Sequence, residues 1–425
     1  MDNTSARPPL VTRKMLIRTV LGLFSLAALL FGYQWFKSLG GDLDLPFNVE
    51  TVGLIAAIQE TSDGNQVVLI QPDGKILPSP GYVAGASDRD VEWRPDGNRV
   101  FFSSDREERV YNIFRWNPGS EKVERRTFGS RAKTTIEFPS EAVDMANDRA
   151  LITSGGFVLE LNPTNGETPQ ILPPVGREIS ASGEGGSASQ FDAVYEKLGS
   201  SFRRAKWAAN GRDWIATVMR RDVGEVLVLQ SMVSDGPPSP PFPIVAGERV
   251  EFDINPKTGE IVFVSIGFQF PDRESIPKEF IVNGRIKRPF TNLVGVIDPN
   301  KLDVRNDPIA ASNSDDIAFS SPTISPDGTS LVLLTGKHVG SGQVEAQNIV
   351  VMPARPNGGK DASRVYPGTA SDPSWAPDSE RILFVHTDKG KRAIFEARKD
   401  GSSIKNLTGQ TGDFSRPIYS PQVKR

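Results

Sequence analysis

One short phrase returns three times along the chain, and it constrains the fold more than any other feature of the sequence. The phrase reads WRPDGNRVFFSSD at 93–105, ISPDGTSLVLLTG at 324–336 and WAPDSERILFVHT at 375–387. Proline presets φ for a turn, Asp accepts backbone N–H groups, and Gly tolerates the exit geometry, so each phrase predicts a tight turn followed by a strand. A phrase repeated in this way predicts an array of similar supersecondary units.

The last complete repeat defines the unit. Four β-prone runs follow one another there: SDPSWAP, ERILFVHT, KRAIFEARKDG and SSIKNLT. Four antiparallel strands in about 40 residues make one blade of a β-propeller. Weaker copies at 141–167, 205–218 and 251–265 keep the same rhythm. The positions that we expect to be equivalent, where a large side chain can pack between neighbouring blades, are Trp93, Val143, Trp207, Phe252, Ile324 and Trp375.

The two ends of the repeat region complete the pattern. SRPIYSP at 415–421 predicts another inner strand, with Tyr419 where Trp375 stands in the previous unit. Residues 52–78 supply three strands without an inner one. The two ends therefore predict one split blade that closes the ring, because an open propeller would leave sheet edges exposed. We expect an all-β propeller over residues 51–425, with seven blades and with six or eight as alternatives.

The Pro-Asp-Gly phrase and the strand after it resemble the WD40-like repeats of TolB-like propellers, which also occur in the propeller domains of prolyl-oligopeptidase-type peptidases. The resemblance is strongest at the three phrases and covers most of residues 51–425 as architecture. It implies a propeller fold and no particular activity. No α/β-hydrolase pattern follows the repeats within this chain, so the resemblance does not imply a peptidase.

An uncharged apolar run, TVLGLFSLAALLFGYQWF at 19–36, precedes the propeller. At about 1.5 Å per residue a helix of this length approaches the bilayer core of about 30 Å. Basic residues gather before the run, so the positive-inside rule predicts a cytoplasmic segment at 1–18, a single transmembrane helix at 19–36 and a linker at 37–50. The propeller then lies on the periplasmic or extracellular side of the cytoplasmic (inner) membrane.

A cleaved signal peptide is the alternative for the same run. No A-x-A-like cleavage site follows it, and its far end is rich in aromatic rings at 33, 35 and 36. Small residues are preferred at a cleavage site. The pattern therefore favours an uncleaved signal anchor.

Composition excludes several function classes. The formal net charge is −3, which does not favour binding to a nucleic-acid backbone, so we predict no nucleic-acid partner. The chain has no Cys and only two His, His338 and His386, too few for a thiolate or His-rich metal site. The chain also lacks the G-x-S-x-G, P-loop, G-x-G-x-x-G and H-E-x-x-H motifs. We therefore predict no catalytic residue, no metal and no cofactor.

Three irregular segments interrupt the repeats, at 181–204, 234–243 and 267–290. The first predicts a short helix, whose simplest role is to cover a blade edge, and the proline-rich second predicts a stiff connector or a polyproline ligand. The third mixes aromatic and basic residues, which are typical of interface anchors. Its candidate partner-binding residues are Phe268, Phe270, Arg285, Lys287, Arg288 and Phe290. A long hairpin packed on its own blade is the alternative interpretation of this segment.

The sequence thus favours a membrane-anchored, non-enzymatic propeller that binds protein partners in or at the membrane, or scaffolds a cell-envelope complex. One alternative is a hydrolase or lyase acting on glycan or peptide. Another is a small-ligand sensor that uses the central channel. Clustered carboxylates with a raised pKa at the channel would favour an enzyme, whereas an exposed aromatic patch on one rim would favour a partner.

Overall fold

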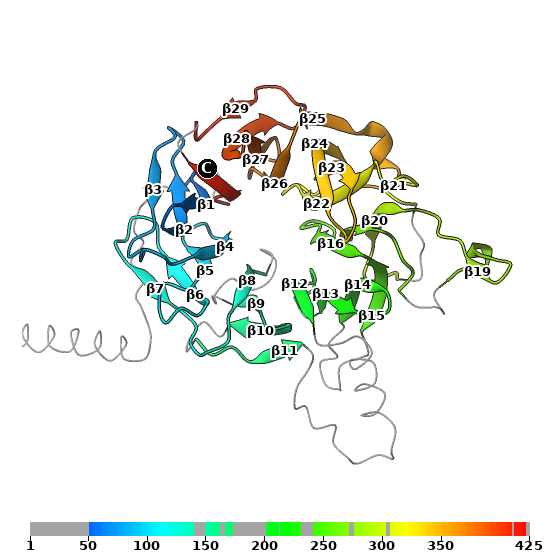
Figure 1. Cartoon of the computed structure of the whole chain (residues 1–425), viewed down its shortest axis with the longest axis horizontal. Helices are drawn as coiled ribbons and strands as arrows, with labels where there is room; N and C mark the ends of the chain where they lie inside the picture. The colour runs from blue at the N-terminus through cyan, green and yellow to red at the C-terminus, as the bar shows by residue number, and fades with distance from the viewer. Residues whose placement is uncertain are drawn as a thin grey trace, which may run out of the picture. The chain divides into compact units, whose positions relative to one another are not determined.

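The computed structural model describes residues 51–139, 149–161, 166–172, 201–211, 213–230, 241–271, 276–302, 307–409 and 412–421. Within these residues, seven antiparallel sheets of four strands each stand around a ring, with an additional two-stranded sheet outside it (Figure 1). The only helical elements described are two short 3-10 turns, η1 (Lys278–Phe280) and η2 (Gly358–Asp361). The predicted all-β propeller and its count of seven blades are confirmed.

Each blade runs from an inner strand beside the central channel to an outer strand at the rim of the ring. In that order, the first four blades contain β30 (Asp413–Tyr419), β1 (Ile55–Thr61), β2 (Gly64–Ile70) and β3 (Ile76–Pro78); β4 (Asp88–Trp93), β5 (Val100–Ser104), β6 (Asn112–Trp116) and β7 (Val123–Arg125); β8 (Thr134–Glu137), β9 (Ala150–Ser154), β10 (Phe157–Leu161) and β11 (Gln170–Leu172); β12 (Phe202–Trp207), β13 (Trp214–Arg220), β14 (Gly224–Gln230) and β15 (Phe242–Gly247).

The last three blades contain β16 (Arg249–Ile254), β17 (Ile261–Ile266), β20 (Asn292–Ile297) and β21 (Ala310–Ser312); β22 (Ala318–Ile324), β23 (Ser330–His338), β24 (Val344–Pro353) and β25 (Ser363–Pro367); β26 (Ala370–Trp375), β27 (Arg381–Asp388), β28 (Lys391–Arg398) and β29 (Lys405–Asn406). The additional hairpin pairs β18 (Ile281–Val282) with β19 (Arg285–Ile286) and lies outside the ring.

The ring closes as the two ends of the repeat region predict. The inner strand β30 pairs with β1 from Ile55↔Tyr419 to Glu60↔Asp413. The bond from Ser420 N to the carbonyl oxygen of Leu54 continues this pairing at 2.8 Å. Segments from opposite ends of the described chain therefore share one blade, and β30 covers the edge of β1 that would otherwise be unpaired.

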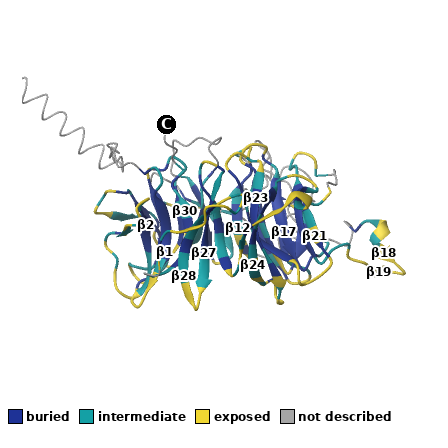
Figure 2. Ribbon diagram, turned by 90° about the horizontal axis from the view of Figure 1, so that it is seen from above, coloured by how far each residue is buried: buried dark blue, intermediate teal, exposed yellow. Residues whose placement is uncertain are grey.

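Apolar side chains fill the spaces between successive sheets. The parts of the ribbon that carry buried residues are dark blue in Figure 2. The tryptophans of the repeated phrase lie in these spaces. Trp93 Nε1 donates to the carbonyl oxygen of Ile418 at 3.2 Å, and Trp375 Nε1 donates to that of Thr323 at 2.9 Å. Each acceptor belongs to the inner strand of the preceding blade. The phrase therefore provides both the turn and a link to the previous blade.

Two predicted equivalences were wrong. The inner strand of the third blade is β8, not a strand around Val143, which lies outside the described residues. In the fifth blade, β16 runs in register with β17 to the pair Ile254↔Ile261, so Ile254 and not Phe252 occupies the position of Trp207, which pairs with Trp214. The turn proline gives the same alignment, because Ile254 precedes Pro256 by two residues, as Trp93 precedes Pro95.

Several other predictions fall outside the described residues. These are the segments 1–18, 19–36 and 37–50, most of the 181–204 segment and most of the 234–243 segment. In the part of the chain that the structure describes, no helix has both the length and the apolar character needed to cross a membrane.

Candidate functional site in the central channel

Five of the inner strands have the same irregularity where they face the central channel. In β4, β8, β22, β26 and β30 one non-glycine residue adopts the left-handed conformation, and the strand pairing shifts register beside it. These residues are Asp90, Thr135, Ser321, Asp372 and Arg416, with φ between 49° and 52°. A bulge of this kind turns a side chain toward a new direction. All five residues line the channel cavity.

The bulges also bring backbone N–H groups within reach of side chains of the preceding blade. Asp90 Oδ2 accepts from Thr135 N at 3.3 Å, and Asp372 Oδ2 accepts from Arg416 N at 3.3 Å. A carboxylate oxygen of Glu251 accepts from Ser321 N in the same way. Carboxylates facing the channel therefore join adjacent blades as well as charging the cavity.

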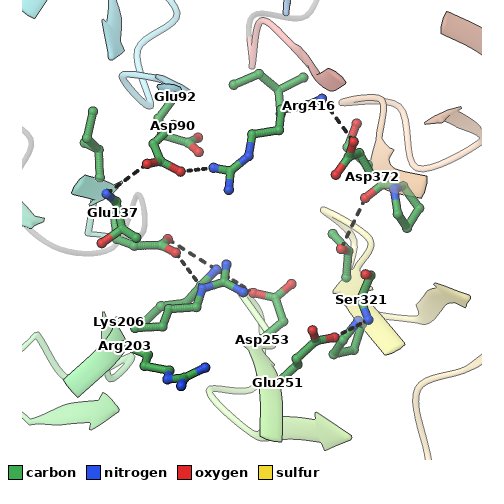
Figure 3. Close-up of a pocket in the computed structure, with 18 of the residues that line it drawn as sticks. Asp90, Glu92, Glu137, Arg203, Lys206, Glu251, Asp253, Ser321, Asp372 and Arg416 are labelled. Carbon is green, nitrogen blue, oxygen red and sulfur yellow. Dashed lines mark hydrogen bonds and ion pairs between the residues drawn. The ribbon is translucent and has the colours of Figure 1, made fainter. Parts of the chain in front are cut away.

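The channel contains two connected cavities. One has a volume of about 590 Å³ and is lined by the inner strands, and the other, of about 740 Å³, lies at the end where those strands finish. Three charged residues line both cavities: Glu92, Glu137 and Lys206. We call the level of these three residues the channel waist. Figure 3 shows their side chains among the others that point into the cavity.

The waist has a charged half and a neutral half. One residue of each inner strand faces the channel at this level: the last residue of β8 and the residue before the last in the other six strands. Four consecutive blades place Glu92, Glu137, Lys206 and Asp253 there. The next three blades place Thr323, Ser374 and Ile418 at the corresponding positions. A ligand in the channel therefore meets charges on one side and uncharged groups on the other.

Two cations hold the middle of the charged half together. Arg204 Nε lies 2.8 Å from Glu137 Oε1, and Lys206 Nζ lies 3.5 Å from Glu137 Oε2 and 2.8 Å from Asp253 Oδ1. Burial alone would raise the pKa of Glu137, but Arg204 and Lys206 outweigh burial and lower it. The pKa of Asp253 is lowered against burial in the same way, chiefly by Lys206.

Glu92 differs from its neighbours. Burial and, second to it, the negative charge of Glu137 raise the pKa of Glu92 to about 8, against the attraction of Lys206 and Arg204. No cation among the described residues forms an ion pair with Glu92. The waist thus contains one carboxyl group that is largely protonated at neutral pH beside one that is ionised, a pattern found where carboxyl groups take different roles.

The second cavity has an aromatic and proline rim, which the turn phrases provide. Its lining includes Trp93, Phe138, Trp375 and Tyr419 together with Pro95, Pro256, Pro326, Pro377 and Pro421. The two tryptophans are buried and the other two rings are half-buried. This rim is therefore the wall of a cavity, and the aromatic surface that it offers lies inside the mouth.

The predicted partner-binding residues separate into two groups. Phe268 is only 7% exposed and packs in the core of its blade, with the rings of Phe270 and Phe290 at 5.2 and 6.5 Å from it. Arg285, Lys287 and Arg288 are exposed on or beside the β18–β19 hairpin. The structure brings the three phenylalanines together and leaves the basic residues at the surface.

Sequence reasoning did not single out the residues of the channel waist. A signal was present, because Glu92, Glu137 and Lys206 directly precede Trp93, Phe138 and Trp207, which pack between blades. Strand alternation turns such neighbours to opposite faces. His338 contacts Glu248 Oε2 at 3.0 Å and Asp315 Oδ1 at 3.4 Å, away from the channel lining. Across the described ranges, no three His, Asp or Glu residues are arranged to hold a metal ion.

The fold and this site define the class of protein: a seven-bladed β-propeller with a charged central channel. No family model matches the chain, and no curated protein matches it. Solved structures of other proteins do match the chain.

TolB from Acinetobacter baumannii shares 12% identity, with 92% of this chain and 70% of that chain covered and a TM-score of 0.47. An oligogalacturonate lyase in complex with manganese shares 9%, with 83% and 84% covered and a TM-score of 0.50. A puromycin-hydrolyzing peptidase of Mycobacterium tuberculosis shares 9%, with 83% and 53% covered and a TM-score of 0.53. At such identities the likeness concerns the fold alone. The propeller fold that the resemblance to TolB-like repeats implied is confirmed by the seven four-stranded blades of the structure.

Proposed function

We propose that this protein is a membrane-anchored, outward-facing propeller that binds a protein partner of a cell-envelope complex without catalysing a reaction. Residues 19–36 are the proposed anchor, on the strength of their apolar sequence and the basic residues before them. The partner-binding element is the β18–β19 hairpin of the 267–290 segment. The observation that supports this choice is the exposure of aliphatic side chains on that hairpin.

The hairpin presents both apolar and basic groups to solvent. Ile281, Val282 and Ile286 are 45%, 49% and 53% exposed. Such a group of exposed aliphatic side chains on a ribbon outside the ring is typical of a contact surface, because covering it removes apolar area from water. Figure 2 shows the hairpin beyond the edge of the blades.

The charge of the hairpin indicates the chemistry of its partner. Lys278, Arg285 and Lys287 are exposed, and among the described residues no carboxylate forms an ion pair with them. The whole chain has a net charge of −3, so this basic segment stands out from its surroundings. An acidic partner with an apolar groove is the complementary surface.

The three phenylalanines form the base of this element. Phe268 packs in the core, and Arg288 Nη1 donates to the carbonyl oxygen of Phe268 at 3.4 Å. These contacts hold the ends of the segment against the blade. The contact with a partner is therefore proposed for the tip, with Phe268, Phe270 and Phe290 as its support.

A pair of variants tests this assignment. Ile281→Ser combined with Val282→Ser removes apolar groups from the tip, and affinity purification from solubilised membranes with mass spectrometry reports which proteins remain bound. We expect the double variant to melt at the wild-type temperature and to lose an acidic partner. The matched control is Val83→Ser, which changes a side chain that is 46% exposed on another part of the ring and should retain the partner. Retention of every partner by the tip variant would contradict the proposal.

The anchor has its own test. Protease added to intact spheroplasts should digest the propeller, and the mature protein should begin at or near Met1. A mature N-terminus near residue 40 would show that the apolar segment is a cleaved signal instead.

The pair Glu92 and Glu137 favours a second candidate function, a hydrolase or lyase acting on glycan or peptide. Enzymes that cleave glycosidic bonds use two carboxyl groups, one of which is protonated through a raised pKa. Incubation of the protein with oligosaccharide and peptide libraries tests this candidate. Product formation that Glu92→Gln abolishes would support an enzyme, and no product from either library would support the binding module.

A further inference from the structure

We propose that the channel waist binds the cationic amino group of a small, elongated ligand between Glu92 and Glu137. This site is separate from the hairpin and from the membrane anchor, so its test is independent of the proposed function. The argument rests on the balance of charges in the channel, on the two cavities that meet at the waist and on the neutral wall across from it.

The channel lining has more carboxylates than cations. The carboxylates that line the first cavity are Asp90, Glu92, Glu137, Glu225, Glu251, Asp253 and Asp372. The cations are Arg203, Arg204, Lys206, Arg249 and Arg416. With all groups ionised, seven negative charges thus face five positive ones. A cavity with such an excess favours a positively charged guest.

Four of the five lining cations form ion pairs with lining carboxylates. Arg204 and Lys206 hold Glu137 and Asp253, whereas Arg249 and Arg416 pair with Glu251 and Asp90. Each of these contacts takes up a positive charge that would otherwise neutralise another carboxyl group. Burial raises the pKa of Glu225, and the fifth cation, Arg203, acts on Glu225 against that rise. The lining carboxylates left without an ion pair among the described residues are Glu92, Glu225 and Asp372.

Two of these three carboxylates, Glu225 and Asp372, accept hydrogen bonds from backbone N–H groups. Glu225 Oε2 accepts from the backbone N–H of Val250 at 3.0 Å, and Asp372 Oδ2 accepts from that of Arg416 at 3.3 Å. The hydrogen-bond donor that acts on Glu92 is the adjacent backbone N–H of Trp93, whereas Lys206 and Arg204 act on it through their charge. Glu92 is therefore the lining carboxyl group with the most unused capacity to accept hydrogen bonds from a ligand.

Glu92 borders both cavities of the channel. It lines the cavity of about 590 Å³ and the cavity of about 740 Å³, as does Glu137. Each of these volumes falls within the range of about 300–1,000 Å³ that is usual for small-molecule sites. Both carboxyl groups thus border the volume in which we place the ammonium group, and the charge of Glu137 acts on Glu92.

The surroundings of the waist suit the uncharged body of such a ligand. Across from the charged half stand Thr323, Ser374 and Ile418, which offer hydroxyl and aliphatic groups. Toward the second mouth, the half-buried rings of Phe138 and Tyr419 line the cavity. A methylene chain that extends from the ammonium group can pack against these surfaces without burying a further charge.

Binding of a cation at this place is coupled to the proton on Glu92. The charged groups that act on Glu92 are Glu137 from β8 and Arg204 and Lys206 from β12. The same cavity also holds Asp253 from β16 and the ion pair between Asp90 of β4 and Arg416 of β30, the strand on the other side of β4. An added ammonium group opposes the repulsion by Glu137 and favours the ionised form of Glu92. Ligand binding at pH 7 should therefore release a proton, and affinity should increase as the pH rises from 6 to 8.

Calorimetry with defined probes tests this site. The full-length chain in a non-ionic detergent is titrated with 1,6-diaminohexane and, for comparison, with 1,6-hexanediol, which has the same length and no charge. We expect the diamine to bind at least about tenfold more tightly at pH 8 than at pH 6, because Glu92 is mostly protonated at the lower pH. Buffers of different ionisation enthalpy should show proton release at pH 7. The diol should not bind.

Two variants test whether diamine binding and proton release depend on the carboxyl group of Glu92. Glu92→Gln should weaken diamine binding about tenfold or more and abolish the proton release. The matched control is Asp372→Asn, which removes a charge from the same cavity but keeps an oxygen for Arg416 N, and it should retain the proton release.

Several results would overturn the proposal: no diamine binding at millimolar concentration, an affinity independent of pH, or equal binding of the diol. All three results are measured on the wild-type protein, so they test the proposal even if the Glu92→Gln variant fails to fold. Wild-type affinity in a folded Glu92→Gln variant, as judged by its thermal transition, would overturn it as well.

Discussion

Phe414 offers a quantitative test of how the ring closes. This residue of the closing strand β30 is 1% exposed and packs in a cluster that includes Ile55 and Val68 of its own blade and Leu383 and Val385 of the neighbouring blade. Phe414→Ala removes a ring that contacts two blades and leaves a cavity between them. Phenylalanine-to-alanine changes at such positions cost about 3–5 kcal/mol. That loss is a large part of the roughly 5–15 kcal/mol by which most domains are stable.

The assay is urea unfolding of the compact unit from residue 49 to residue 425, followed by tryptophan fluorescence. The matched control is Phe128→Ala, the same chemical change at a side chain that is 62% exposed. We expect the control to lower stability by about 1 kcal/mol or less, since it loses little more than a contact with Arg125. If both variants unfold at the same midpoint, β30 does not pack as a core strand and the reasoning on closure fails.

Three further predictions concern the ends of the ring and the channel. Deleting residues 413–425 should lower the unfolding midpoint far more than deleting residues 422–425, because only the first deletion removes β30 from its pairing with β1; equal midpoints would count against closure. Glu92 has a folded-state pKa of about 8, so the folded protein holds an extra proton and loses stability as the pH rises from about 5 to 8. Glu92→Gln should therefore raise the melting temperature relative to wild type more at pH 8 than at pH 5, and a difference independent of pH would contradict this assignment. Lys206→Met should cost about 3 kcal/mol in urea unfolding, because it leaves Glu137 and Asp253 without their shared cation; an unchanged midpoint would show that the pairing adds no stability.

The sequence by itself determined the architecture of this protein. The turn phrases at Trp93, Ile324 and Trp375, the four β-prone runs in the last repeat and the incomplete units at the two ends were enough to predict seven blades and a split closing blade. These signals are local, since a Pro-Asp turn and the alternation of side chains in a strand depend on neighbouring residues. Because the local pattern repeats along the chain, it predicts the whole ring of blades.

Only the tertiary structure decided where the functional chemistry lies. It placed Phe268 in the core and exposed Ile281 at the tip of the same segment, a distinction that composition does not reveal. It also brought Glu92, Glu137 and Lys206 together at the channel waist from three different blades. Burial and the charges of neighbours set the pKa of a carboxyl group, and both depend on residues that are distant in sequence but close in space. A periodic pattern predicts which side chains face the channel, but their mutual distances, and with them the unpaired carboxyl group of Glu92, depend on the bulges and on the way the blades assemble.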